Sequence, residues 1–202
     1  SWTQAGREEL RALAAAASAV GYAIIRYTNT ASGDDYLLLT EPEDAENPRH
    51  WGTYVFRLDP SEPYVVQVPR PLFEINVFEF GVQLFEQLKA EALLIGGAHP
   101  LANVDGSADL VQLENKGSLF SLVSQVLLRE AGDAPMLALQ CRAFGLREDY
   151  PPPQADVLMA LASGERRPDS LDPLETRLMA DLTGNGLSVQ LLDGSLDAAG
   201  YE

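Results

Sequence analysis

The stretch from Asn76 to Gly97, NVFEFGVQLFEQLKAEALLIGG, contains a helix pattern followed directly by a strand pattern. Its first apolar residues recur at helical spacing, which predicts a helix with one apolar face. Asn76 with Glu79 three residues later is typical of a capping box, so we expect the helix to begin there. Residues 91–97 are a short apolar run that ends in paired glycines, and this run predicts a buried strand.

The second half of the chain repeats this alternation. One helix is predicted from Gly117 to Glu130, and a second begins at Asp172, with Pro173 at its first position and Glu175 at its third. Further apolar strands are predicted at 136–141, 156–161 and 187–192. Apolar strands that alternate with amphipathic helices are typical of a parallel sheet covered on both faces.

The first half is predicted to hold one helix and several short strands rich in β-branched and aromatic residues. The polar segment 41–49 is predicted to be a solvated loop, and residues 99–116 are predicted to be a second loop. The helix is expected at 4–19 and the strands at 22–28, 36–40, 52–58 and 64–68. We therefore predict one α/β domain over residues 1–202, with three layers: a mixed sheet with parallel central strands, and helices on both faces.

The composition excludes several classes of protein. The chain has 202 residues, 46% of them hydrophobic, which is enough for one sizeable core. Its net charge of -16 argues against nucleic-acid binding and against docking on an anionic membrane. No apolar run reaches the ~18 residues that span a bilayer, and the start lacks a signal-peptide pattern. We expect no membrane insertion and a chain excised from a longer protein; the pattern does not indicate a compartment.

Metal and cofactor sites of the common kinds are also excluded. One cysteine and two histidines form neither a cysteine zinc cluster nor a three-histidine site. The sequence contains no phosphate loop, no dinucleotide glycine fingerprint and no Gly-x-Ser-x-Gly elbow. We therefore predict no bound metal and no cofactor.

Candidate site residues follow three of the predicted strands. Arg70, His99 and Arg142 each lie at or just after a strand end, and Glu74 follows Arg70 by four residues. Ligands of open α/β sheets bind beyond the carboxyl ends of the strands, and guanidinium groups suit carboxylates. We expect these four residues to bind a small anionic or peptide-like ligand. The alternative is a surface ion pair and an exposed loop histidine, without a ligand.

Two other chemistries are possible for His99 on the sequence alone. It follows the paired glycines, where it could act as a general base or bind a metal together with Asp105 and Asp109, although that spacing is not specific. Cys141 could form a thiolate–imidazolium pair with His99, or it could be a small buried hydrophobic residue. Ser118 is interpreted as a helix cap.

The order of these segments resembles that of zinc-dependent hydrolase-like domains with the carboxypeptidase-type α/β fold. The segments are Pro69-Arg70-Pro71 with Glu74, then Gly97-Ala98-His99, then residues 140–144. The group includes poly-γ-glutamate hydrolases and N-formylglutamate amidohydrolases, and the resemblance spans about residues 52–192. In that family a Pro-His-Pro segment with an acidic residue supplies metal ligands, and a later strand ends in a Gln-x-His-Gly-Phe-like segment.

The chain departs from that pattern at two of its histidines. Arg70 and Arg142 stand in their place, and a guanidinium cannot coordinate zinc. The resemblance therefore implies a non-catalytic binding or regulatory domain that has lost its metal ligands, with an arginine-lined cleft for an anionic ligand. One alternative is an active metal-dependent hydrolase of amide or peptide-like bonds, with Glu74 and His99 as catalytic residues. Another is a structural domain that serves assembly with a protein partner or with other domains of the same chain.

Overall fold

The computed structural model describes residues 4–112, 117–143, 155–160 and 171–191. The chain divides into two compact units, Ser1–Arg142 and Ala143–Glu202. The expectation of a single domain over residues 1–202 stays a prediction. Within the described residues, no helix has both the length and the apolar character needed to cross a membrane.

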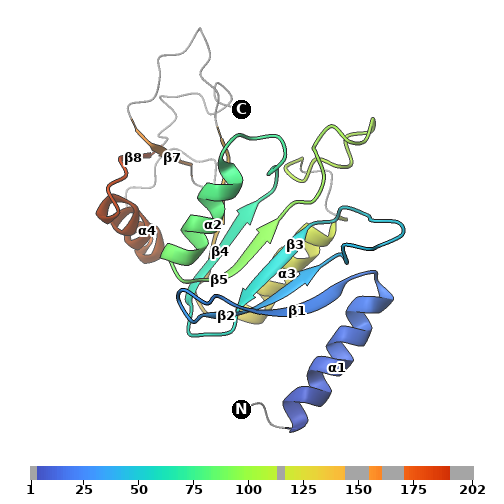
Figure 1. The fold of residues 1–202 in the computed structure, drawn as a ribbon. Helices are drawn as coiled ribbons and strands as arrows, with labels where there is room; N and C mark the ends of the chain where they lie inside the picture. The colour runs from blue at the N-terminus through green and yellow to red at the C-terminus, as the bar shows by residue number, and fades with distance from the viewer. Residues whose placement is uncertain (1–3, 113–116, 144–154, 161–170, 192–202) are drawn as a thin grey trace. The chain divides into compact units, whose positions relative to one another are not determined.

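The first unit is built on a mixed sheet of six strands in the order β1-β2-β3-β5-β4-β6 (Figure 1). Strands β1, β2, β3 and β5 pair antiparallel in that order, whereas β4 lies parallel to both β5 and β6. The strands are β1 Ala23–Thr28, β2 Asp35–Thr40, β3 Thr53–Arg57, β4 Glu62–Val68, β5 Ala90–Ile95 and β6 Leu137–Gln140. The predicted mixed sheet is confirmed, with its parallel pairs, β5 with β4 and β4 with β6, at one side of the sheet.

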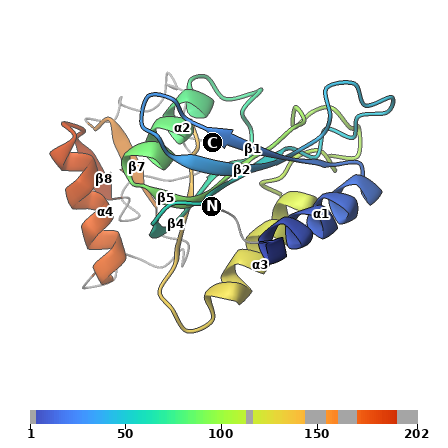
Figure 2. The same ribbon diagram turned by 60° about the horizontal axis from the view of Figure 1, so that its bottom comes forward.

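Three helices cover the two faces of this sheet. They are α1 Gln4–Ala19, α2 Val77–Gln87 and α3 Leu119–Ala131. Figure 2 shows α2 on one face and α1 with α3 on the other, so the predicted three-layer α/β fold is confirmed. Because side chains alternate along a strand, β4 serves both layers: Val65 belongs to the core with Phe120 of α3. Val68 faces α2, where a Cβ added to Gly81 would lie 2.3 Å from its Cγ2.

The two helix starts in the first unit differ in their chemistry. Ser118 caps α3 as expected, because its hydroxyl accepts a hydrogen bond from the Ser121 N–H at 3.1 Å. The capping box expected at Asn76 and Glu79 is wrong. Asn76 has a φ of 62° and its side chain makes no capping hydrogen bond. Asparagine is one of the few non-glycine residues that adopt this left-handed conformation readily, so Asn76 turns the chain into α2 instead of capping it.

The second unit contains a parallel strand pair joined by a helix. Strands β7 Val157–Met159 and β8 Val189–Leu191 flank α4 Pro173–Gly184 in the sequence and pair in parallel. They form a two-stranded sheet of their own, so the expectation that the strands at 156–161 and 187–192 belong to the main sheet is wrong. The predicted start of α4 is confirmed: the Asp172 carboxylate accepts the Glu175 N–H, and the Glu175 carboxylate accepts the Asp172 N–H.

Candidate ligand site at the carboxyl ends of the strands

Arg70, Glu74 and Arg142 come together beyond the ends of β4 and β6. The Arg142 Nε donates a hydrogen bond to the Glu74 Oε1 at 2.7 Å, and the Arg70 Nη1 lies 3.6 Å from the same oxygen. On its other side Arg70 binds Asp109 through two parallel bonds, Nε to Oδ1 at 2.9 Å and Nη2 to Oδ2 at 2.7 Å. The four residues form a chain of alternating charge, which we call the rim cluster: Asp109, Arg70, Glu74 and Arg142.

The rim cluster is electrically balanced, because Asp109 joins it as a second carboxylate. The side chains of Glu74 and Asp109 are only 6% and 8% exposed, against 19% for Arg70 and 23% for Arg142. Buried ionic groups of this kind need their partners, since removing one leaves an uncompensated charge away from water. The cluster therefore ties three strand-end loops together, and Arg142 is its most exposed member.

The charge of Asp109 should make the first unit sensitive to acid. Its two bonds from Arg70 hold the pKa of the carboxyl below its ordinary value. Such a group stabilises the fold fully above its ordinary pKa of about 4, and this stability is lost as the pH falls through the lower folded-state pKa. We expect Asp109→Asn to lower the free energy of unfolding at neutral pH and to flatten its fall below about pH 4.

Urea unfolding at a series of pH values measures this effect. The exposed Asp133, just beyond α3, provides the matched control, and Asp133→Asn should retain the acid sensitivity of the parent. An Asp109→Asn variant that loses stability in acid as steeply as the parent would show that the rim cluster is not responsible.

His99 lies next to Phe73, the residue that precedes Glu74 in the sequence. Its ring meets the Phe73 ring edge-on, with 5.2 Å between centroids, and its Nδ1 accepts a hydrogen bond from the Leu101 N–H at 3.2 Å. A neutral His99 therefore carries its proton on Nε2. Within the described ranges, no hydrogen bond joins His99 to Glu74 or to the two arginines.

Two of the alternative chemistries find little support. Cys141 is buried, and burial raises the pKa of its thiol to about 12, which disfavours the thiolate that a nucleophile needs. The Asp105 carboxylate accepts the Ser107 N–H at 3.0 Å within its own turn. Among the residues that the structure describes, no three His, Cys, Asp or Glu side chains gather as a metal site would require.

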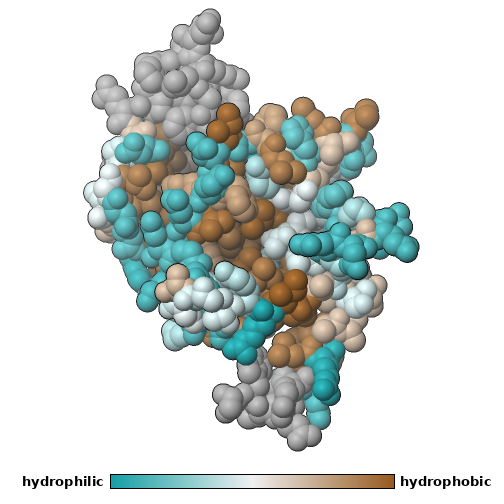
Figure 3. Space-filling model, in the orientation of Figure 1, coloured by the Kyte–Doolittle hydropathy of each residue, from teal (hydrophilic) through white to brown (hydrophobic). Residues whose placement is uncertain are grey.

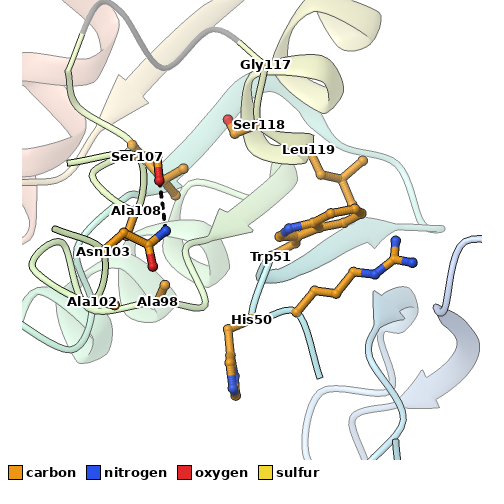
Figure 4. Close-up of a pocket in the computed structure, with 12 residues that line it drawn as sticks. His50, Trp51, Ala98, Ala102, Asn103, Ser107, Ala108, Gly117, Ser118 and Leu119 are labelled. Carbon is orange, nitrogen blue, oxygen red and sulfur yellow. Dashed lines mark hydrogen bonds between the residues drawn. The ribbon is translucent and has the colours of Figure 1, made fainter. Parts of the chain in front are cut away.

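A depression of about 480 Å³ opens at the same end of the sheet, on the α3 side (Figure 4). Trp51 and Leu119 lie on one side of it and Asn103 with Ser107 on the other, with Ser118 at the start of α3 (Figure 4). Arg49 and His50 also line it, and none of the described lining residues is a carboxylate. For a chain with a net charge of -16, this is an unusual environment.

Glu41 shapes the loop that carries Arg49, His50 and Trp51. Its carboxylate accepts the backbone N–H groups of all three residues at distances of 3.0 to 3.4 Å. The left-handed conformation of His50, with a φ of 55°, lets these successive N–H groups converge on one anion. The Arg49 guanidinium lies 4.5 Å from the centre of the Trp51 ring, a cation–π contact.

Gly97 allows this loop to pack against the end of β5. A Cβ added at Gly97 would lie 2.5 Å from the Gly52 nitrogen and 2.6 Å from the His50 oxygen. Both atoms belong to the backbone, so only glycine permits this approach. The loop around His50 and Gly52 is thus the one that approaches the paired glycines at the end of β5.

Sequence reasoning did not select the residues of the depression. The sequence predicts only loops for the segments that contain Arg49, Asn103 and Ser107. The adjacent Arg49, His50 and Trp51 were the available signal, because a cation, an imidazole and an indole in one polar loop suit ligand contact. Comparison with protein-family models, with curated proteins and with solved structures gave no match for this chain. The fold and the site define a three-layer α/β protein with a ligand-sized depression at the strand ends.

Proposed function

We propose that the first unit is a non-catalytic binding domain that holds a small anionic ligand at the carboxyl ends of its parallel strands. The observation that supports this most is the depression of about 480 Å³, whose described lining carries Arg49 and no carboxylate. In an acidic protein, such a surface is a local site of favourable potential for an anion.

The proposed ligand has a carboxylate and an apolar body. Its carboxylate would lie near Ser118, where the first turn of α3 presents N–H groups and the positive end of the helix dipole, and Arg49 in the same lining would add a favourable charge. Ser107 and Asn103 offer further hydrogen-bond donors on the opposite side. Trp51 and Leu119 would contact the apolar part of the ligand (Figure 4).

The rim cluster has a supporting role in this proposal. Arg70 and Glu74 position the loops. Arg70 binds Asp109, which directly follows the lining residues Ser107 and Ala108 in the sequence. Arg142 keeps 23% of its side-chain surface exposed, but it is not among the described residues that line the depression, so it too acts by holding Glu74 in place. Glu74 contacts both guanidiniums, which argues against the alternative of a metal-dependent amide hydrolase that uses Glu74 and His99.

Benzoate and benzamide test the proposal, because they share one shape and differ in charge. The chain has two tryptophans, so a Trp2→Phe background leaves Trp51, on the wall of the depression, as the fluorescent reporter. We expect benzoate to bind at least about tenfold more tightly than benzamide, and Arg49→Gln to remove about that factor.

Arg129→Gln is the matched control for the charge change. Arg129 is 73% exposed near the far end of α3 and should not affect benzoate binding. Equal affinity for benzoate and benzamide, or an equal loss in the two arginine variants, would contradict an anion site at this depression.

A further inference from the structure

A second surface of the first unit exposes large apolar side chains. Leu72, Phe73, Ile75 and Phe78 are 64%, 51%, 82% and 42% exposed, although they lie within seven residues of one another. They surround a depression of about 470 Å³ between the end of β5 and the start of α2. We call these four residues the apolar rim. Figure 3 shows apolar surface near this end of α2 and across the sheet beside it.

The sheet continues this apolar surface on the side of α2. Ile25, Leu38 and Val55 are directly paired across β1, β2 and β3. Their neighbours Ile24, Leu39 and Tyr54 pack in the core under α1 and α3, so this row faces the other way, toward the α2 layer. Ile25 is 46% exposed. The apolar rim and this row together expose more apolar surface than singly scattered surface residues would.

One exposed carboxylate lies beside the apolar rim. Glu74 and Glu79 line its depression, and no Lys, Arg or His is among the described lining residues, but Glu74 is nearly buried and already paired with Arg70 and Arg142. Glu79 is exposed in the first turn of α2. The two depressions at this end of the sheet thus differ in character: one is lined by Arg49 without a carboxylate among its described residues, and the other is apolar with Glu79 at its edge.

We propose that the apolar rim is a docking site for a basic amphipathic segment of a partner protein. Apolar side chains of such a segment would enter the depression, its lysines or arginines would meet Glu79, and the net charge of -16 on the chain would favour its approach. A second copy of this chain fits poorly, because two molecules of charge -16 repel each other. This docking site is separate from the proposed anion site and does not depend on it.

A pair of synthetic peptides tests this proposal on the full chain. One is an amphipathic helix of leucine and lysine, and the other keeps its leucines but has glutamate in place of lysine. We expect the lysine peptide to bind and the glutamate peptide not to bind. Ile75→Asn and Glu79→Gln should each weaken binding of the lysine peptide by about tenfold, because each removes one half of the recognition.

Two control variants separate docking from general attraction to an acidic protein. Leu128→Asn and Glu130→Gln make the same kinds of change on α3, at side chains that are also well exposed. They should leave peptide affinity unchanged, and Ile75→Asn should leave benzoate affinity unchanged. Equal weakening by the control variants, or equal binding of both peptides, would overturn the proposal. So would self-association of the chain through Ile75 in sedimentation, or binding to phosphatidylcholine vesicles in place of the peptide.

Discussion

Replacing Gly97 by alanine should cost the first unit about 3 kcal/mol of unfolding free energy, at the upper end of what one added methyl group does in a packed interior. The new Cβ would lie 2.5 Å from the Gly52 nitrogen and 2.6 Å from the His50 oxygen. A flexible side chain could turn away from such a contact, but these are backbone atoms. The end of β5 and the loop around His50 would therefore have to separate.

This separation should also be visible in ligand binding. His50 and Trp51 line the anion site, so the same substitution should abolish the change in Trp51 fluorescence on addition of benzoate. Gly117→Ala is the control, because Gly117 lines the same depression but, among the described residues beyond its chain neighbours, no atom lies within 4 Å of an added Cβ. Urea unfolding and benzoate titration measure both effects. A Gly97→Ala variant as stable as Gly117→Ala would show that the close approach is not needed.

The arrangement of helices and strands could be predicted because its signals are local. Alternating apolar runs indicated the strands, and Asp172 with Pro173 and Glu175 marked the start of α4 as it is observed. Asn76 with Glu79 has a similar spacing, yet Asn76 adopts a left-handed conformation instead. A spacing of three residues supplies the side chains of a capping box but does not determine φ at its first residue.

The candidate site was predictable only in part, since its contacts join distant segments. Strand order brought Arg70, Glu74 and Arg142 to one end of the sheet, as the sequence indicated. Asp109 completes the rim cluster from 39 residues beyond Arg70, and nothing in its own segment indicates that pairing. The depression around Trp51 depends on the Glu41 carboxylate, which holds the backbone of residues eight to ten positions further along the chain. The resemblance to zinc-dependent hydrolases stays a prediction.

The second large effect is expected at Arg57, the last residue of β3, which the sequence did not single out. Its side chain is only 2% exposed, and its guanidinium contacts groups on three sides. The Nε donates to the Ala90 oxygen at 3.2 Å, and Nη2 donates to the Phe85 oxygen at 3.3 Å and to Glu86 at 3.1 Å. Asp34 and the Tyr36 hydroxyl accept from Nη1.

Arg57→Ala should lower the free energy of unfolding of the first unit by about 3 to 5 kcal/mol. The loss combines broken hydrogen bonds, carboxylates left without their cation, and the stacking of the guanidinium on the Phe85 ring, whose centre lies 4.7 Å away. Arg57→Lys should recover only part of this stability, because an ammonium group cannot reproduce the planar array of five donors.

Arg26 offers a matched comparison on the same sheet. It also pairs with a carboxylate, Asp35, but its side chain is 46% exposed, so Arg26→Ala should cost less than about 1 kcal/mol. Urea unfolding followed by Trp51 fluorescence reports on the first unit in all three variants. If Arg57→Ala and Arg26→Ala lower the free energy of unfolding equally, the contacts of the buried Arg57 are no stronger than those of the exposed Arg26. A larger loss at Arg57 that is only partly recovered by lysine would show that β3, β5 and α2 are held together through one buried guanidinium.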